Sequence, residues 1–273
     1  MHEKHEKAIR LRSGFEMPVL GLGTWELTGR KCTETVKKAL EMGYKHIDTA
    51  EYYGNEKETG RAISGFDRSE IFITSKVWMT HLKHDDVIKA CEASLKRLGT
   101  SYLDLYLIHW PNEKISLSET MKAMEHLVKD GKVRSVGISN FDIKRTREAL
   151  EVSSVPVSNN QVEFHPHLYQ KGLLEFCKKS GIAITAYCPL ARGKVLKDPV
   201  ITGIAEKYGR TPAQVTLRWL LQKGTVVIPK ASSEQHLKEN MNIFGWKLKK
   251  EDESRIDSIV IKRRQIDMGF ADF

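Results

Sequence analysis

Short apolar runs rich in β-branched residues alternate along this chain with longer amphipathic segments. The amphipathic pattern is clearest over residues 83–98 and 116–130, whose length is typical of helices. Alternation of strand-like and helix-like segments predicts βαβ units and a parallel sheet. The apolar runs cover residues 19–23, 45–48, 71–76, 103–109, 133–138, 158–162, 182–186 and 225–228.

Eight such units predict a closed (β/α)8 barrel, that is, a TIM barrel, rather than an open doubly wound sheet. The runs at 71–76 and 182–186 contain few charges, as expected of strands covered on both faces. A barrel of this kind needs about 250 residues, and the chain has 273. No linker or composition break divides it, so we expect a single domain over residues 1–273.

Two further features add detail to this barrel. Residues 7–18 read apolar, turn, apolar, with Ser13 and Gly14 in the turn, and predict a short hairpin before the first barrel strand. Thr211 followed by Pro212 is typical of an N-cap with proline in the first helical position. We expect the helix that follows to be additional to the eight of the repeat.

The composition is that of an ordinary globular protein, with 40% hydrophobic and 29% charged residues. No segment approaches the roughly 18 consecutive apolar residues of a membrane helix, so no membrane association is expected. The sequence MHEKHEKAIR at the start is charged and lacks the apolar stretch of a signal peptide. These features favour a cytoplasmic protein.

Charge and cysteine content argue against two other classes of function. The formal net charge is +9, but lysine and arginine are interleaved with acidic residues, so we expect no nucleic acid partner. The four cysteines form no CxxC pair, which argues against a zinc site or a disulfide framework. His165-Pro166-His167 has no evident third ligand, and we interpret it as structural and expect no metal.

Four hydrogen-bonding or titratable residues lie at the ends of three neighbouring strands of the predicted barrel. Asp48 ends the second run and Tyr53 follows it, while Lys76 ends the third run and His109 the fourth. In (β/α)8 barrels, functional groups lie at the C-terminal ends of the strands. The sequence therefore predicts that these side chains meet at one mouth of the barrel.

Together these side chains are suited to protonate an alkoxide as it forms from a carbonyl group. Tyrosine has a reference pKa of about 10 and is a poor acid at neutral pH, and a neighbouring lysine is expected to lower that pKa. A carboxylate would keep the lysine charged, and a neutral histidine could orient the carbonyl oxygen. Each residue alone has an ordinary structural explanation, but four at successive strand ends favour a catalytic site.

Seven motifs make the chain similar to a known family. DTAEYYGNE, ITSKVW, LYLIHWP, VGISNF, NQVEFHP, AYCPLARG and VIPKAS resemble the aldo-keto reductases in order and spacing, over essentially the whole chain. The resemblance implies a (β/α)8 barrel that reduces aldehydes or ketones to alcohols with NADPH or NADH, without a Rossmann domain. The chain most resembles short bacterial and archaeal members, such as the 2,5-diketo-gluconate reductases, which act on small aldehydes and keto sugars.

The resemblance also assigns roles to the strand-end residues. Tyr53 would be the general acid, Lys76 and Asp48 would tune it, and His109 would position the carbonyl. Amide and hydroxyl side chains would hold the nicotinamide carboxamide, because they supply both donors and acceptors, and Tyr187 would stack on the nicotinamide ring. The expected cofactor ligands are Gly23, Thr24, Trp25, Ser139, Asn140, Gln161, Tyr187, Leu190, Arg192, Gly193, Lys230, Ala231, Ser232, His236, Glu239 and Asn240.

The expected phosphate site lies in the loops after the last two strands, as is common in such barrels. Lys230 would neutralise the adenosine 2′-phosphate, which favours NADPH over NADH, although NADH stays possible. The family often has serine directly after this lysine and arginine six residues after it, whereas this chain has Ala231 and His236. Losing a bidentate guanidinium weakens phosphate recognition, so the two cofactors need to be compared directly.

Aromatic residues that follow strand ends are expected to form the wall of an apolar substrate cavity. A small carbonyl compound is the expected substrate, and a monomer the expected state. The substrate-binding residues are Trp25, Tyr52, Trp78, His109 and Trp110.

Two other functions fit parts of the same sequence. A regulatory protein with this barrel would bind nucleotide but turn over slowly, whereas the intact set of four strand-end residues favours an enzyme. A glycosidase on a similar barrel would use Glu51 and Glu163 as paired carboxylates. That reading leaves the motifs expected to hold the nicotinamide unexplained.

Overall fold

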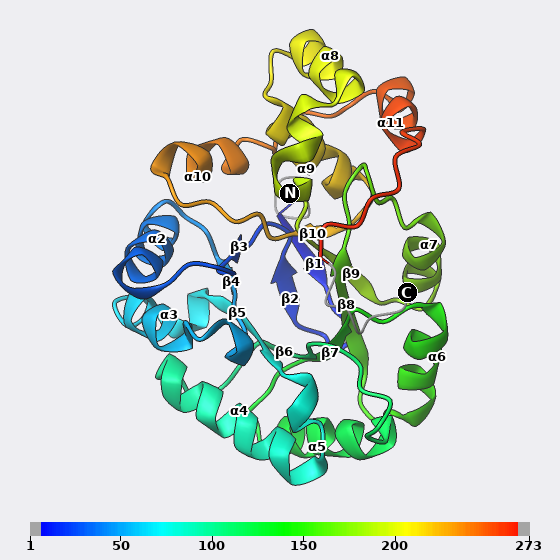
Figure 1. Ribbon diagram of the computed structural model, residues 1–273. Coiled ribbons are helices and arrows are strands. Elements are labelled where there is room, and N and C mark those ends of the chain that lie inside the picture. Colours follow the sequence, from blue (N-terminus) through cyan, green and yellow to red (C-terminus); the bar gives the residue numbers. More distant parts are fainter. Residues whose placement is uncertain (1–6, 267–273) are drawn as a thin grey trace.

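The computed structural model describes residues 7–266, and its parallel sheet curls into a barrel with helices around the outside (Figure 1). Consecutive strands are parallel neighbours in the sheet, in chain order from β3 to β10. Each strand overlaps one of the eight predicted runs, which confirms the expected barrel. The strands are β3 (Leu22–Gly23), β4 (His46–Asp48), β5 (Phe72–Val77), β6 (Leu105–Ile108), β7 (Val136–Ser139), β8 (Val157–Glu163), β9 (Ala183–Tyr187) and β10 (Val226–Val227).

Hydrogen bonds between the segment leading into β3 and β10 close the barrel. Gly21 N donates to Val227 O at 2.9 Å, and Val227 N donates to Val19 O at 2.8 Å. Gly23 has no side chain for a packing reason, because a Cβ atom there would lie 2.7 Å from the carbonyl oxygen of Ile228. The first and last strands therefore approach closely only because position 23 is glycine.

Helices surround the barrel on the outside, as Figure 1 shows. The two clearest amphipathic segments of the sequence form α4 and α5, within one residue of the expected bounds. The helices are α2 (Gly29–Glu41), α3 (Glu56–Ile63), α4 (His84–Leu98), α5 (Leu117–Lys129), α6 (Ile143–Val152), α7 (Lys171–Lys179), α8 (Pro199–Tyr208), α9 (Pro212–Gln222), α10 (Glu234–Met241) and α11 (Lys250–Asp257).

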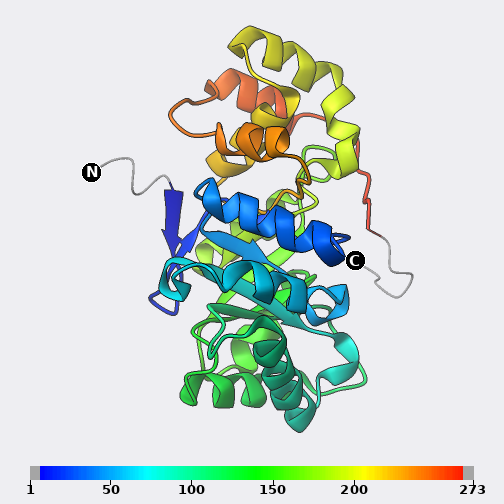
Figure 2. The ribbon, with the colours of Figure 1, turned by 90° about the vertical axis from the view of Figure 1, so that its left-hand side faces the viewer.

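The predicted hairpin is present and covers one end of the barrel. Strands β1 (Ala8–Arg10) and β2 (Glu16–Pro18) pair antiparallel, and Gly14 takes the positive φ of 91° that the turn requires. Leu11 and Met17 pack against residues at the starts of barrel strands, such as Phe72 and Leu105. The hairpin therefore closes the N-terminal end of the barrel and leaves the opposite end for the site (Figure 2).

Helix α9 begins with the expected cap, but it is not the additional helix. The Thr211 hydroxyl accepts from Gln214 N at 3.2 Å, and Gln214 Oε1 accepts from Thr211 N at 3.1 Å, which completes a capping box. Helix α9 contacts β10 directly and is buried along most of its length, whereas α8 packs on α9 and α11. Of the two helices between β9 and β10, α8 is therefore the additional one, and it lies farther from the strands in Figure 1.

Within residues 7–266, we find no helix long and apolar enough to cross a membrane.

Candidate active site

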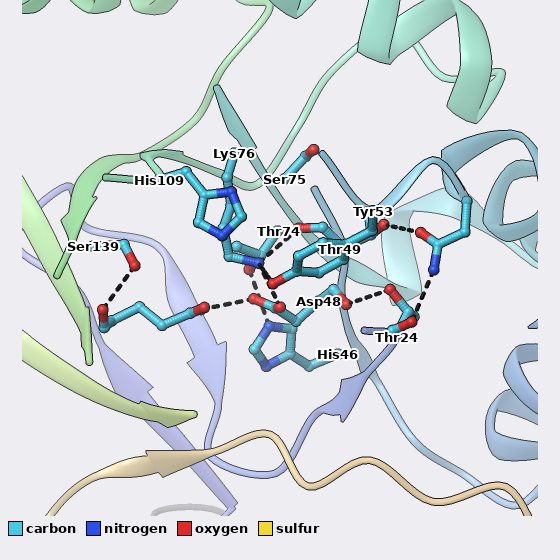
Figure 3. A network of polar contacts seen from close by, with 12 residues as sticks. Thr24, His46, Asp48, Thr49, Tyr53, Thr74, Ser75, Lys76, His109 and Ser139 are labelled. Atoms are coloured by element: carbon cyan, nitrogen blue, oxygen red, sulfur yellow. Dashed lines mark hydrogen bonds and ion pairs between the residues drawn. The ribbon is translucent and has the colours of Figure 1, made fainter. Parts of the chain in front are cut away.

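The four predicted strand-end residues lie together at the C-terminal mouth of the barrel. Lys76 near the end of β5 donates from Nζ to Asp48 Oδ1 at 2.6 Å and to the Tyr53 hydroxyl at 3.1 Å (Figure 3). Tyr53 belongs to a short 3₁₀ turn, Glu51–Tyr53, that follows β4. The rings of His109 and Tyr53 lie edge to face, with centroids 5.5 Å apart.

The Lys76 ammonium has a partner for each of its three protons. The third donates to the Thr49 carbonyl oxygen at 2.8 Å, and the whole side chain is 0% exposed. The second oxygen of Asp48 accepts from Gln161 Nε2 at 2.7 Å. Because every polar atom of the Lys76–Asp48 pair is held, the hydroxyl of Tyr53 meets a hydrogen-bond donor in a fixed position.

The pKa of Tyr53 is raised overall, whereas the lysine beside it was expected to lower it. Burial raises the pKa of Tyr53 well above its usual value, and the Asp48 carboxylate raises it further. Burial also lowers the pKa of Lys76, an effect that Asp48 opposes. The sequence shows the neighbouring charges but not the loss of water around the phenol, and that loss dominates here. Tyr53 is therefore a protonated phenol throughout the neutral pH range.

His109 is a neutral imidazole, as the sequence argument required. Burial lowers its pKa well below the usual value, and the positive charge of Lys76 acts in the same direction. Its backbone carbonyl accepts from Asn140 Nδ2 at 3.0 Å, which ties the end of β6 to the end of β7. A neutral imidazole in this position can donate one hydrogen bond without carrying a charge.

A cavity of about 640 Å³ opens above these residues. Its aromatic wall is a stack in which Tyr52 lies between Trp25 and Trp78, with centroids 5.9 and 3.8 Å away. Trp78 also meets the His109 ring edge to face at 5.2 Å. Trp110 lines the cavity as well, so all five expected substrate-binding residues face this space.

The side chains expected to hold a nicotinamide carboxamide line the same cavity. Ser139 donates from Oγ to the Gln161 carbonyl at 2.8 Å, and Asn140 Nδ2 donates to Ser139 Oγ at 3.1 Å. The Tyr187 hydroxyl donates to Asn140 Oδ1 at 2.8 Å. These contacts hold amide and hydroxyl groups beside the Tyr53–Lys76 pair, and such groups fit the carboxamide of a nicotinamide.

Several expected cofactor ligands do not line the cavity. Thr24 is buried behind it and donates to the Asp48 carbonyl at 2.9 Å. Ala231 and Asn240 are buried, whereas Ser232 and His236 are exposed. The remaining one, Glu239, is half-buried in α10. These expected ligands, on α10 and in the residues just before it, therefore lie outside the cavity that surrounds Tyr53.

The sequence analysis did not identify one residue that lies beside the expected phosphate ligands. Glu26, directly after Trp25, accepts from Lys230 Nζ at 2.6 Å and from Arg192 at 2.8 Å. The hydrogen bond from Lys230 lowers the pKa of the Glu26 carboxyl group. All three residues line the cavity. Glu26 is the last residue of the motif GLGTWE. The sequence alone does not show that it pairs with Arg192 and Lys230, which belong to two other loops.

Strained backbone is concentrated around this cavity. Among the described residues, the non-glycine positions with positive φ are Glu26, Asn140, Cys188, Ala191 and Arg192, with φ between 48° and 63°. All of them except Ala191 line the cavity, and Ala191 directly precedes Arg192 in the chain. Such conformations cost about 1–3 kcal/mol each and persist where surrounding structure enforces them, often at functional sites.

The comparisons with known proteins agree with this arrangement of residues. Residues 19–261 match the sequence model of the Aldo/keto reductase family. The chain belongs to this family. This aldo-keto reductase is therefore an NAD(P)H-dependent oxidoreductase that reduces carbonyl compounds to alcohols.

Individual relatives match this aldo-keto reductase over nearly their full length. It is 46% identical over 254 residues to a glyoxal reductase of Bacillus subtilis, covering 92% of each chain. A solved structure assigned as 2,5-diketo-D-gluconic acid reductase B superposes with a TM-score of 0.93 at 37% identity, covering 98% of each chain. An aldo-keto reductase of Bombyx mori in complex with NADP superposes with a TM-score of 0.90 at 32% identity, covering 96% of this chain and 95% of that one.

The two carboxylates of the glycosidase alternative have other partners in this reductase. Glu51 accepts from the backbone N–H of Trp78 and from His81. Glu163 accepts from His165 and from backbone groups near the end of the described chain. Neither residue is among those that line the cavity. They therefore do not form a pair across a substrate, and the glycosidase interpretation is wrong.

Proposed function

We propose that this aldo-keto reductase uses Tyr53 as the general acid in reducing small carbonyl compounds, with NADPH as the preferred cofactor. The observation that supports this most directly is the 3.1 Å hydrogen bond from Lys76 Nζ to the Tyr53 hydroxyl, beneath a cavity with amide ligands beside it. Among the described residues that line the cavity, the other phenols are Tyr52, which is exposed, and Tyr187, whose hydroxyl already donates a hydrogen bond to Asn140.

In this proposal, the carbonyl oxygen of the substrate accepts hydrogen bonds from the Tyr53 hydroxyl and the His109 imidazole. A reduced nicotinamide held by Ser139, Asn140 and Gln161 would supply the hydride that the carbonyl carbon accepts. Tyr53 then gives its proton to the oxygen, and the hydrogen bond from Lys76 stabilises the phenolate that is left. Tyr53 recovers a proton from solvent before the next turnover.

The protonation states in the free protein suit this direction of reaction. The raised pKa of Tyr53 keeps a proton available at neutral pH, and the lowered pKa of His109 keeps the imidazole uncharged. An uncharged imidazole orients the carbonyl without adding a second cation next to Lys76. These protonation states therefore support proton donation by the tyrosine rather than by the histidine.

The preference for NADPH rests on cations at the phosphate end. Lys230 and Arg192 both border the cavity, and His236 lies exposed in the first turn of α10. Glu26 opposes the preference, because its single carboxylate already pairs with both cations. A 2′-phosphate carries more charge than one carboxylate and offers three acceptor oxygens. We therefore expect it to displace Glu26 from Lys230.

The substrate is proposed to be a small aldehyde or ketone, including keto sugars. The cavity of about 640 Å³ has to hold both the nicotinamide and the substrate, so the room left for a carbonyl compound is small. One similar protein is named as a glyoxal reductase. The active form is proposed to be a monomer.

A panel of carbonyl compounds tests this proposal. Two-carbon and three-carbon dicarbonyls, an aromatic aldehyde and a keto sugar acid are each incubated with NADPH and with NADH, and the loss of reduced-nucleotide absorbance is followed. We expect turnover with at least one small carbonyl, and higher kcat/KM for NADPH than for NADH. Quenching of tryptophan fluorescence by NADPH without any turnover would instead indicate a nucleotide-binding regulatory protein.

A further inference from the structure

A buried carboxylate with no part in the proposed reaction holds the last described segment of the chain. Glu163, at the end of β8, is 0% exposed. Its Oε1 accepts from Gln265 N at 2.6 Å, and its Oε2 accepts from Ile266 N at 2.9 Å. A carboxylate that loses its water on burial needs such partners, and here two backbone donors supply them.

Neighbouring groups fix both the carboxylate and the segment. His165 Nε2 lies 2.8 Å from Glu163 Oε1, and it is also fully buried. Arg263 N donates to the His167 carbonyl at 2.7 Å, and the His167 ring lies 2.8 Å from Asp198 Oδ2. The segment 263–266 is therefore bound by groups on β8 and the loop after it.

This attachment brings the segment to the mouth of the barrel. The chain after α11 runs past β9 in Figure 1, and in Figure 2 it descends at the end opposite the hairpin. Ile266 lines the same cavity as Tyr53 and His109, and its side chain is only half-buried. It thus presents apolar surface that a ligand in the cavity can cover.

We propose that Glu163 is a positioning residue, which anchors the C-terminal segment by its backbone and thereby fixes Ile266 as an apolar contact for aromatic carbonyl substrates. The proposal rests on the proposed carbonyl reduction, and it adds to that reaction a determinant of substrate preference. Glu163 itself touches neither substrate nor the reacting atoms in this scheme. It acts only through Ile266.

The substitution Glu163→Gln tests whether the two hydrogen bonds to the backbone hold the segment in place. An amide accepts at one oxygen only, and its NH₂ group would face a backbone N–H, so at least one of the two hydrogen bonds is lost. The side chain keeps its size and the charge leaves the buried site. We expect the segment to detach while the barrel stays folded, which thermal unfolding checks.

Substrate preference is the first readout. We compare glyoxal with an aromatic aldehyde, and expect Glu163→Gln and Ile266→Ala each to raise KM for the aromatic aldehyde about fivefold, because partial burial of an isoleucine side chain contributes an effect of that order. KM for glyoxal should rise by less than twofold. In the double variant, Ile266→Ala should add less than twofold to the effect of Glu163→Gln.

The exposed Glu151 on α6 provides the matched control, and Glu151→Gln should leave both values of KM unchanged. Equal loss of kcat for both aldehydes in Glu163→Gln would overturn the proposal, because it would place Glu163 in support of the catalytic groups. A fall in KM for the aromatic aldehyde would also overturn it, since Ile266 would then be a steric barrier.

A second readout does not depend on activity. The Arg264–Gln265 peptide bond is a trypsin site, and its Gln265 N–H is the group that Glu163 binds. We expect trypsin to release the peptide 265–273 at least fivefold faster from Glu163→Gln than from Glu151→Gln, as followed by mass spectrometry. If the protein reduced no carbonyl at all, the proposed function would fail, and this cleavage rate would still show whether Glu163 holds the segment.

A pair of variants in the segment covers the case in which Glu163→Gln does not fold. Gln265→Pro removes the backbone N–H that Glu163 binds, whereas Gln265→Ala keeps it and removes only a side chain that donates to Arg263 O. The proline variant should raise KM for the aromatic aldehyde, and the alanine variant should not. Equal behaviour of the two would show that this hydrogen bond does not position Ile266.

Discussion

The cavity has a buried ion pair at one end and an exposed ion pair at the other. We call these the carbonyl end and the phosphate end, after the groups that are proposed to bind there. At the carbonyl end, Lys76 and Asp48 pair at 2.6 Å and have side chains that are 0% and 2% exposed. At the phosphate end, Lys230 and Glu26 also pair at 2.6 Å, but their side chains are 43% and 45% exposed. The two ion pairs therefore have the same length but are expected to contribute differently to the free energy of unfolding.

Burial decides how each pair responds to change. A buried pair loses its water, so removal of one partner leaves an uncompensated charge that costs about 3–5 kcal/mol. An exposed pair is screened and contributes about 0–1 kcal/mol. We infer that the carbonyl end is fixed before substrate arrives, whereas the phosphate end can exchange Glu26 for a phosphate group. The predictions below test this contrast, from the largest effect to the smallest.

The largest effect is expected at the hydroxyl of Tyr53. Tyr53→Phe keeps the ring and its packing against Trp25 and His109, but removes the proton donor. We expect kcat to fall by about 10²–10⁴, as is typical for loss of a general acid, while NADPH still quenches fluorescence with the same Kd. Retention of more than a tenth of the wild-type rate would assign the proton to another group.

Removal of Lys76 should affect both activity and stability. Lys76→Met leaves Asp48 buried with only Gln161 and no positive charge, so we expect the free energy of unfolding in urea to fall by about 3–5 kcal/mol. Turnover should be lost as well, because the phenolate of Tyr53 loses its hydrogen-bond donor.

The double variant Lys76→Met with Asp48→Asn separates these two roles. It leaves no charge in the buried site, so it should recover more than half of the lost stability and none of the activity. A single Lys76→Met variant within 1 kcal/mol of wild type would show that Asp48 reaches water, and the contrast between the two ends would then fail.

Acid pH should destabilise the folded protein through His46, which begins the strand that ends at Asp48. Burial lowers the pKa of this histidine to about 4, and Nε2 lies 3.0 Å from Thr74 Oγ1 on β5. The folded protein needs the neutral ring, so stability is complete above the unfolded pKa of about 6.5 and is lost as pH falls towards 4. The loss at pH 5 should be about 2 kcal/mol by linkage.

Urea unfolding at pH 7 and pH 5 measures this loss, and the substitution His46→Asn supplies the comparison. Asparagine does not titrate, so its variant should show a smaller difference between the two pH values, whatever its stability at pH 7. Because His46 is buried, adding 0.5 M salt should change the difference little. An equal loss at pH 5 in wild type and variant would place the titrating group elsewhere.

The smallest effects are expected at the phosphate end, where the two partners should act in opposite directions. Lys230→Ala should weaken NADPH about tenfold and NADH by less than twofold, because only NADPH carries the 2′-phosphate. Glu26→Gln should tighten NADPH about threefold, since it releases Lys230 and Arg192. Fluorescence titrations at two salt concentrations give both values, and the effects should shrink at high salt.

Equal losses for both cofactors in Lys230→Ala would indicate that this lysine supports the loop after β10 instead of the 2′-phosphate. Weaker binding of NADPH to Glu26→Gln would mean that the carboxylate orders the site rather than competing with the ligand. Neither variant should change the free energy of unfolding by more than about 1 kcal/mol, which is the expected limit for an exposed pair.

Much of the fold followed from local patterns. The strand at residues 72–77 was recognisable because it contains few charges, as expected of a strand covered on both faces, and the hairpin because Ser13-Gly14 interrupts two apolar stretches. The identity of the additional helix was not predictable, since α8 and α9 have similar lengths and both begin with a cap and a proline. Only their packing shows that α9 is the helix against the barrel.

The tertiary structure alone decided how the site behaves electrostatically. The sequence by itself placed Asp48, Lys76 and His109 at neighbouring strand ends, because parallel strands deliver their C-terminal residues to one mouth. It did not show that burial would raise the pKa of Tyr53, since desolvation depends on every side chain that excludes water from the phenol. Nor did it pair Glu26 with Lys230 or Glu163 with Gln265, because these contacts join loops and termini whose positions are set by closure of the barrel.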